Sequence, residues 1–117
     1  MAVSASDFDV VIVGAGPVGL VAALLLGKQN VSVLLLEKEL SPFPLPRAAH
    51  IDHEIMRIFQ SIGVADEVAS SSEISTRYEF LNVSGDVLMR FDTGRAAALS
   101  GWPPSNMIHQ PSIEQVL

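Results

Sequence analysis

A glycine-rich turn divides the longest uncharged stretch of this 117-residue chain into two halves of different character. The stretch comprises the 18 residues from Val10 to Gly27, and glycines stand at positions 14, 16 and 19. The residues before the turn are β-branched, as in a strand, whereas residues 20–26 are rich in Ala and Leu, as in a helix. The pattern predicts a strand, a tight turn and a helix in direct succession.

The same stretch is long enough to be considered as a transmembrane helix. Asp7 and Asp9 precede it, and neither Lys nor Arg stands before it to anchor a span or to form a signal n-region. The glycine-rich turn at its centre also suits a spanning helix poorly. We therefore expect no membrane span.

The following residues complete a predicted βαβ unit. We expect a strand over residues 8–13, a helix from Pro17 to about Gln29 and a second strand over residues 31–37. Proline suits the first position of a helix, where no hydrogen bond is lost. The continuous apolar runs indicate parallel strands that are buried on both faces. The fold class is therefore α/β, with a Rossmann-like dinucleotide-binding portion at the N-terminus.

The three glycines have the spacing of a dinucleotide-binding fingerprint, which requires a preceding strand and a following helix. Gly14 permits the tight turn, and Gly16 lets the backbone approach a pyrophosphate without an intervening Cβ. Gly19 allows the helix to pack closely on the strand. The alternative is a structural βαβ unit whose glycines serve packing only.

Two features beside the glycines complete the predicted cofactor site. The N–H groups around Pro17, Val18 and Gly19, together with the helix dipole, present partial positive charge to phosphates. Glu37, at the end of the second strand, would accept hydrogen bonds from a ribose diol. Its negative charge disfavours a 2′-phosphate, so the pattern predicts NAD or FAD in this site and not NADP.

Further elements are expected after the βαβ unit. A proline-rich loop covers residues 41–46, and the next helix has Asp52 as its N-cap and Gly63 as its C-cap. Apolar residues recur there at helical spacing, namely Ile51, Ile55, Ile58, Phe59 and Ile62, and we expect the last four of them in the core. The remaining predicted elements are a helical turn at 64–68, a hairpin of strands 78–83 and 87–91, a loop at 95–106 and a helix from Pro111.

Charge and cysteine content exclude several function classes. The net charge is −6, from 13 acidic and 7 basic residues, and the arginines are scattered, which argues against nucleic acid. Without cysteine there is no disulfide or thiolate site. A reducing cytosol is thus permitted, and we expect a cytoplasmic protein.

A cluster of His50, Asp52 and His53 invites comparison with a metal site. No further ligand is in view, so we interpret it as a helix cap with two solvent-facing histidines, and we expect no metal. Trp102, in a Gly-Trp-Pro loop, either anchors that loop or lines a substrate pocket.

Several segments together resemble the FAD-dependent aromatic-ring hydroxylases, which are single-component flavin monooxygenases. The resemblance is carried by residues 9–20, 36–38, 46–48 and 51–63. Residues 101–103 and 109–111 are similar to the branch that hydroxylates 3-(3-hydroxyphenyl)propionate and related phenols. The resemblance implies FAD as cofactor, NAD(P)H and O2 as co-substrates, and a phenolic substrate in aromatic catabolism.

The resemblance also implies roles for three residues. Lys38 would lie near the adenosine ribose, and Arg47 would reach the FAD pyrophosphate or ribityl chain. Gln110 would contact the phosphate or ribityl part. From the residues alone, Arg47 suits a phosphate because guanidinium donors match phosphate oxygens, and the alternative is an ordinary surface arginine. Gln110 could equally cap the final helix.

Members of that family are several times longer than this chain. We therefore interpret residues 1–117 as the N-terminal part of an FAD-binding domain, with about 74–110 contributing to the substrate-side sheet and loop. We expect no activity from it alone; its partner would be the remainder of the enzyme or a complementing chain, and no catalytic residue can be nominated. Alternatives are an NAD-binding dehydrogenase module and a non-catalytic truncated interaction piece.

Overall fold

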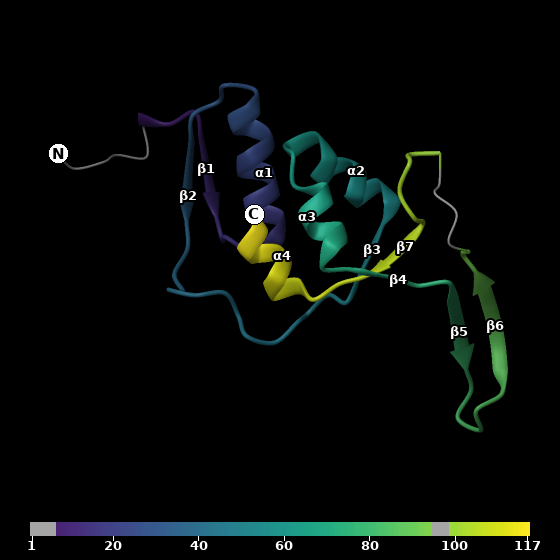
Figure 1. Cartoon of the computed structure of the whole chain (residues 1–117). Helices are drawn as coiled ribbons and strands as arrows, with labels where there is room; N and C mark the ends of the chain where they lie inside the picture. Colours follow the sequence, from purple (N-terminus) through teal and green to yellow (C-terminus); the bar gives the residue numbers. More distant parts are fainter. Residues whose placement is uncertain (1–6, 95–98) are drawn as a thin grey trace.

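The computed structural model describes residues 7–94 and 99–117. Residues 95–98 of the predicted loop therefore lie outside the described part. The elements, labelled in Figure 1, are β1 (Val10–Val13), α1 (Pro17–Lys28), β2 (Val33–Leu36), β3 (His50–Asp52), α2 (His53–Ile62), α3 (Ala65–Ser70), β4 (Glu73–Ile74), β5 (Arg77–Leu81), β6 (Val87–Asp92), β7 (Ser105–Met107) and α4 (Gln110–Val116).

The predicted βαβ unit is confirmed. β1 and β2 are parallel, with Val10 opposite Val33 and Val13 opposite Leu36, and α1 connects them. Each strand has four residues, because the ladder stops where the chain turns into the flanking loops. The glycine turn and the end of β2 consequently meet at one edge of the sheet.

Side-chain hydrogen bonds hold both ends of this parallel pair. At the start of β1, the Asp9 Oδ2 atom accepts hydrogen bonds from Ser32 N at 2.9 Å and Ser32 Oγ at 2.6 Å. At the other end, Ala15 N donates to Glu37 Oε2 at 2.7 Å. The unit is therefore closed at both ends by residues that lie 22 or 23 positions apart in the sequence.

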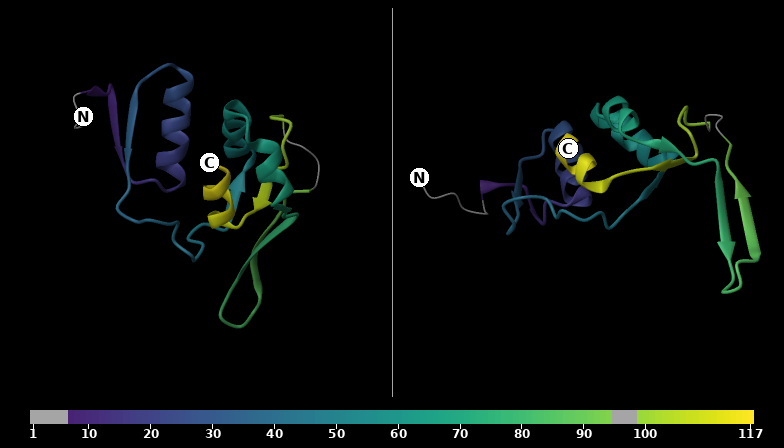
Figure 2. Two further views of the ribbon diagram at one scale, coloured as in Figure 1. Left: turned by 60° about the vertical axis from the view of Figure 1, so that its left-hand side comes forward. Right: turned by 60° about the horizontal axis from the view of Figure 1, so that its bottom comes forward.

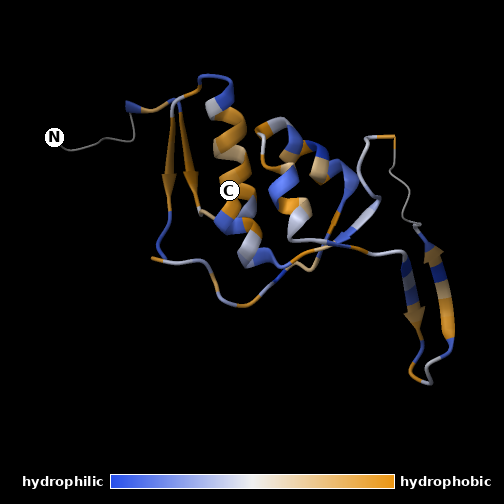
Figure 3. Ribbon diagram, viewed as in Figure 1, coloured by the Kyte–Doolittle hydropathy of each residue, from blue (hydrophilic) through white to orange (hydrophobic). Residues whose placement is uncertain are grey.

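The prediction that these strands are buried on both faces is wrong for the described part of the chain. Alternate residues are exposed along β1, and the side chain of Val13 is 83% exposed. α1 covers one face of the pair, while the other face presents apolar side chains to solvent. Figure 3 shows β1, β2 and α1 as a nearly continuous apolar group. A continuous apolar run is typical of a strand that is covered on both faces. Among the described residues, only α1 covers this pair of strands, and it covers one face.

The core lies instead among α2, α3 and α4. Its buried side chains are Met56, Phe59, Ala65, Val68 and Ile113. Both predicted caps of α2 are confirmed: Asp52 Oδ1 accepts hydrogen bonds from the N–H groups of Glu54 and Ile55, and Gly63 has the left-handed φ of +88°.

One predicted core position on α2 is wrong. Ile55 is 36% exposed, whereas its neighbour Met56 is fully buried and contributes to the centre of the core. The buried face of α2 is centred on Met56 and Phe59, so it is rotated by about one residue from the face that the isoleucines suggested.

A second, three-stranded antiparallel sheet was missed by the sequence analysis. Its order is β3-β7-β4, with His50 opposite Met107 and Asp52 opposite Ser105. Two of the three residues of β7, Ser105 and Asn106, fall within the loop predicted at residues 95–106. These strands have two or three residues and are largely polar, so they carry no period-two pattern that could indicate them.

The predicted hairpin is confirmed as β5 and β6, and it projects from the rest of the molecule (Figure 2). Paired residues of antiparallel strands share a face. One face carries two ion pairs, Arg77 with Asp92 and Glu79 with Arg90. The other face carries apolar side chains, Tyr78, Phe80, Met89 and Phe91. Tyr78 packs edge-on against the His50 ring, with centroids 5.3 Å apart. Phe80, Met89 and Phe91 are about half exposed, so most of this surface is open to solvent.

No helix in residues 7–94 and 99–117 combines the length and the apolar character needed to cross a membrane. The apolar stretch considered for that role divides into β1, the glycine turn and the 12-residue α1.

Candidate functional site

The glycine turn has the geometry that its sequence predicts. Gly14 has φ +105°, which favours glycine, and its N–H donates to Leu36 O at 2.7 Å. A Cβ on Gly19 would lie 1.9 Å from Gly14 O, so helix and turn approach too closely for any side chain. A Cβ on Gly16 would meet nothing within 4 Å. The missing side chain at Gly16 therefore leaves open space at the beginning of α1.

The N-terminus of α1 offers free hydrogen-bond donors beside that space. The first N–H groups of a helix have no acceptor within the helix. Pro17 stands at the first position and has no N–H, so Val18 and Gly19 supply the donors of this turn. Gly16, the N-cap, makes no side-chain cap bond, and the first turn contains no acidic residue. The helix dipole at this end is thus not neutralised by the helix itself.

Glu37 joins the end of β2 to the glycine turn. Its Oε1 accepts hydrogen bonds from Lys38 N at 2.7 Å and Glu39 N at 2.9 Å, while its Oε2 accepts from Ala15 N. A carboxylate has about four acceptor positions, so capacity remains for a ligand hydroxyl. The pKa of Glu37 lies below its ordinary value of 4.5, because the N–H groups of Glu39, Ala15 and Lys38 stabilise the charged form.

The depressed pKa of Glu37 gives a measurable pH dependence. A carboxyl group with a lowered folded-state pKa stabilises the fold above its ordinary pKa, and this contribution disappears as the pH falls through the folded-state value. We expect the Glu37 carboxyl carbon, followed by NMR, to titrate with a midpoint below 4.5. The Ala15 amide should shift with the same midpoint, and this shift should vanish in Glu37→Gln. A midpoint at or above 4.5 would contradict the assigned hydrogen bonds.

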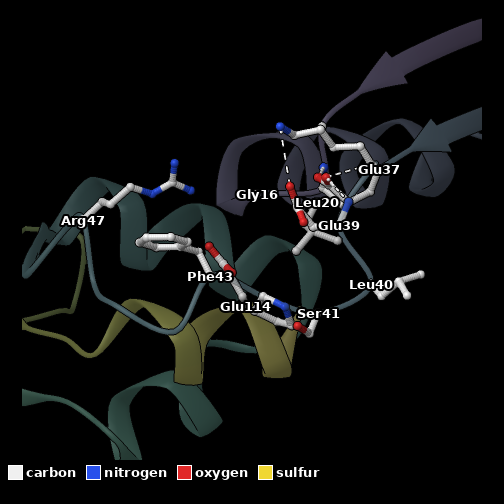
Figure 4. A pocket seen from close by; sticks show the side chains of 13 residues that line it. Gly16, Leu20, Glu37, Glu39, Leu40, Ser41, Phe43, Arg47 and Glu114 are labelled. Carbon is white, nitrogen blue, oxygen red and sulfur yellow. Dashed lines mark hydrogen bonds and ion pairs between the residues drawn. The ribbon is translucent and has the colours of Figure 1, made fainter.

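Two basic residues follow this carboxylate in the sequence, one directly beside it and one at the far end of the next loop. Lys38 is highly exposed and pairs with Glu39 at 3.5 Å. Arg47 lies at the far end of the loop after β2, where its guanidinium carbon lies 5.5 Å from the centroid of the Phe43 ring. Figure 4 shows Arg47 and Phe43 at one end of the site and Glu37 at the other. Lys38 and Arg47 therefore lie at opposite ends of one cavity.

That space is a cavity of about 760 Å³, large enough for a nucleotide-sized ligand. It brings together five of the predicted site residues, namely Gly14, Gly16, Glu37, Lys38 and Arg47. The sequence analysis missed several further lining residues, among them Glu39, Leu40, Phe43 and Glu114. The rule that ligands bind beyond the carboxyl ends of parallel strands could have indicated the loop residues. No sequence pattern or fold rule indicated that Glu114, in the last helix, would line this cavity.

The remaining predicted residues lie elsewhere. Pro17, Val18 and Gly19 line a smaller hollow of about 370 Å³ on the β1–α1 side of the turn, which shares Gly14 and Gly16 with the main cavity. The glycine turn therefore separates two spaces, and a phosphate group at Gly16 would lie between them.

Gln110 lines neither space, and its amide bonds within the chain. It is the first residue of α4, after the N-cap His109, so the helix-cap alternative is not found. Its Oε1 accepts hydrogen bonds from Arg47 N at 3.0 Å and Ala48 N at 2.8 Å, and its Nε2 donates to Glu114 Oε1 at 2.7 Å. The structure thus connects Gln110 to the Arg47 loop.

Trp102 and the histidines of the sequence analysis have structural partners. Trp102 Nε1 donates to Gln60 Oε1 at 3.0 Å, which anchors its loop to α2. His50 Nε2 lies 3.0 Å from Ser105 Oγ, and His53 Nδ1 lies 3.1 Å from Ser100 Oγ. Residues 7–94 and 99–117 contain no group of three or more His, Cys, Asp or Glu side chains that could hold a metal ion.

Comparison with known proteins gives one family. The sequence matches the family model described as FAD binding domain over residues 7–117. A probable NADH-specific resorcinol 4-hydroxylase of Rhodococcus jostii (strain RHA1) is 43% identical over 112 residues, covering 93% of this chain and 20% of the relative. A 3-(3-hydroxy-phenyl)propionate/3-hydroxycinnamic acid hydroxylase of Mycobacterium sp. (strain JLS) is 36% identical over 112 residues, covering 96% and 19%. The chain thus spans about a fifth of the length of these relatives.

Solved structures show the same relationship. p-Nitrophenol 4-monooxygenase PnpA from Pseudomonas putida DLL-E4 is 29% identical, with a TM-score of 0.77, over 92% of this chain and 27% of that protein. The flavin-dependent monooxygenase PieE, solved in complex with FAD and substrate, is 28% identical, with a TM-score of 0.72, over 93% of this chain and 21% of that protein.

Proposed function

The chain belongs to the FAD binding domain family, and from this premise we propose that it forms the part of an FAD-dependent aromatic hydroxylase that binds the ADP half of the cofactor. The observation that carries the proposal is the hydrogen bond between Ala15 N and Glu37 Oε2. It brings the phosphate-binding turn and the ribose-binding carboxylate, 22 residues apart in sequence, to one wall of a single cavity.

The donors and acceptors around this cavity, and in the adjoining hollow at the start of α1, fit an adenine dinucleotide. Gly16 leaves the approach to the helix N-terminus open, where Val18 and Gly19 supply free N–H groups for a pyrophosphate. Glu37 has acceptor capacity for a ribose diol, and Lys38 lies beside it. Arg47 lines the opposite end of the cavity, and we assign it to the phosphates or the ribityl chain, because a planar guanidinium matches phosphate oxygens.

The reaction that we propose for the whole enzyme follows from this family. When bound, FAD supplies the redox chemistry: it takes electrons from NADH and activates dioxygen, and one oxygen atom enters a phenol ring while the other leaves as water. The residues of this chain hold and orient the cofactor. Among them we assign no base that would activate the phenol.

A phenol with a second substituent at the meta position is the substrate class that we propose. Resorcinol and 3-(3-hydroxyphenyl)propionate, named in two relatives, share that pattern. The larger identity, 43%, is to the protein named as NADH-specific, which favours NADH as electron donor. The absence of a helix long and apolar enough to span a membrane, among the described residues, accords with a cytoplasmic enzyme, which we propose.

We also propose that residues of about 74–110 contribute to the substrate side of the enzyme. The hairpin of β5 and β6 projects from the rest of the molecule (Figure 1), and most of its apolar face is exposed. That face is suited to pack against the remainder of the enzyme or a complementing chain.

Titration of the chain with ADP and with its 2′-phosphorylated form tests the cofactor proposal. We expect ADP to bind more tightly, because Glu37 accepts from the free ribose diol and repels a 2′-phosphate. Glu37→Gln should weaken ADP binding by about tenfold or more, since a charge-assisted hydrogen bond is lost. It should also reduce the difference in affinity between ADP and its 2′-phosphorylated form. Glu67→Gln, an exposed change on α3, is the matched control. Equal affinities, or no binding of any adenine nucleotide, would contradict the proposal.

A chimera tests the connection to hydroxylation. The corresponding segment of the Rhodococcus resorcinol 4-hydroxylase would be replaced by residues 7–117 of this chain. Retention of flavin and resorcinol-dependent oxidation of NADH support the proposal, whereas a folded chimera without flavin contradicts it.

A further inference from the structure

We propose that His50 contacts the phenolic substrate, with the Nδ1 atom of its imidazole bonded to a substrate hydroxyl. This inference deepens the proposed function and rests on it. It starts from the observation that the His50 side chain is exposed, although the chain holds its ring from two sides.

The two partners of the His50 ring come from different elements. Its Nε2 atom lies 3.0 Å from the Oγ atom of Ser105, a residue of β7 that is only 2% exposed. The ring of Tyr78 packs against it edge-on, with centroids 5.3 Å apart and an interplanar angle of 82°. The Tyr78 hydroxyl donates in turn to the Sδ atom of Met107, the residue opposite His50 on β7. A side chain that is already held in this way loses little conformational entropy when it binds a ligand.

The second nitrogen of the ring is available for a ligand. Among residues 7–94 and 99–117, none bonds to His50 Nδ1. In a neutral imidazole one nitrogen donates a hydrogen bond and the other accepts one. A serine hydroxyl and a phenol hydroxyl can each donate or accept, so either tautomer of His50 satisfies both partners. The free nitrogen therefore suits a hydroxylated aromatic ring.

The place of His50 follows from the direction of the cofactor in the proposed binding mode. Glu37, assigned to the ADP ribose, lies at one end of the cavity, and Arg47 lies at the other (Figure 4). The flavin half consequently extends beyond Arg47. The chain extends beyond it as well, because His50 begins β3 three residues later, and three extended residues span about 10 Å. A span of this size is comparable with the ribityl chain that joins the pyrophosphate to the flavin ring.

β3 also lies next to the segment that we propose for the substrate side. Figure 1 shows β3 between α4 and the hairpin of β5 and β6. The ring contact between His50 and Tyr78 joins β3 to β5, the first strand of that hairpin. His50 is thus beside both the flavin end of the cofactor and the substrate segment. A phenol bound between them would meet the imidazole.

The chimera with the Rhodococcus resorcinol 4-hydroxylase is the protein in which this inference is tested. A glutamine amide reaches the position of the histidine Nε2 atom, so His50→Gln keeps the bond to Ser105 and removes Nδ1. We expect the KM for resorcinol to rise about tenfold with kcat nearly unchanged, because a contact made equally in the ground state and the transition state affects KM alone. Flavin content and the KM for NADH should stay the same.

His50→Asn is the matched variant. The shorter asparagine amide reaches the position of Nδ1, so this change keeps the substrate contact and removes the bond to Ser105. We expect a KM for resorcinol within about twofold of the unsubstituted chimera. His53→Gln, which alters the other pair of an imidazole and a serine, is the control and should leave this KM unchanged.

The order of the two His50 variants decides the inference. A purely structural role through Ser105 predicts that asparagine is the more damaging residue. That order, equal KM values in both variants, or loss of flavin in His50→Gln would overturn the inference and leave the proposed function standing. An unsubstituted chimera without flavin contradicts the proposed function, and the inference fails with it.

Discussion

Replacement of Gly16 by valine is expected to lower the affinity for FAD by about a hundredfold or more without unfolding the chain. Gly16 has φ −74°, which any residue adopts, and a Cβ there meets nothing within 4 Å. The valine methyl groups would fill the space through which a pyrophosphate approaches Val18 N and Gly19 N. Loss of two charge-assisted hydrogen bonds accounts for an effect of this size.

Titration calorimetry with FAD and thermal unfolding by circular dichroism measure the two parts of this expectation. Gly27→Ala is the control, because Gly27 lies on the same helix with open space around its Cβ position. It should leave FAD affinity unchanged and raise helix stability slightly. An affinity of Gly16→Val within about twofold of the parent would show that the space at Gly16 is not used by the cofactor.

The second large effect is expected at Gly19, and it concerns folding. In Gly19→Ala the new Cβ would lie 1.9 Å from Gly14 O, which is a backbone atom and cannot rotate away. The turn and α1 must separate, and the hydrogen bond from Gly14 N to Leu36 O is then disturbed. We expect a loss of about 3 kcal/mol or more in unfolding free energy, a large share of a small domain's total.

Urea denaturation gives this unfolding free energy directly, with Gly27→Ala again as the matched alanine substitution. A free energy of Gly19→Ala within about 1 kcal/mol of the parent would contradict the close contact. Substitutions at the two glycines thus test different properties. A side chain at Gly16 would occupy the space proposed for the ligand, whereas a side chain at Gly19 would clash with the backbone of the turn.

The elements predicted correctly are those whose determinants are local. The βαβ unit follows from the change from β-branched to Ala/Leu-rich sequence around a glycine turn, and α2 follows from its caps Asp52 and Gly63. The hairpin follows from two alternating runs joined through Gly85. In each case a few neighbouring residues fix the backbone, and tertiary contacts only refine the ends.

The elements that were missed depend on partners far away in the sequence. β3 and β7 pair across more than 50 residues, and their polar side chains give no indication of a strand. The bond between the Gln110 amide and the loop around Arg47, 63 residues before it, had no indication in the sequence either, and a contact of Gln110 with the cofactor stays a prediction. Such contacts depend on how elements pack, which periodicity and spacing do not describe.

The same distinction between local and distant determinants applies to the candidate site. The turn, Glu37 and Lys38 could be placed together because a parallel βαβ unit brings the ends of its two strands to one edge. Glu114 could not, because nothing local connects the last helix to the loop after β2. Whether these residues bind FAD remains a prediction that the proposed titrations address.

The hydrogen bonds that close both ends of the parallel pair have a consequence for the free energy of ligand binding. The contacts of Asp9 with Ser32 and of Ala15 with Glu37 are made within the chain itself. The protein therefore holds the glycine turn and the carboxylate in alignment, so the binding free energy is not reduced by the cost of ordering them.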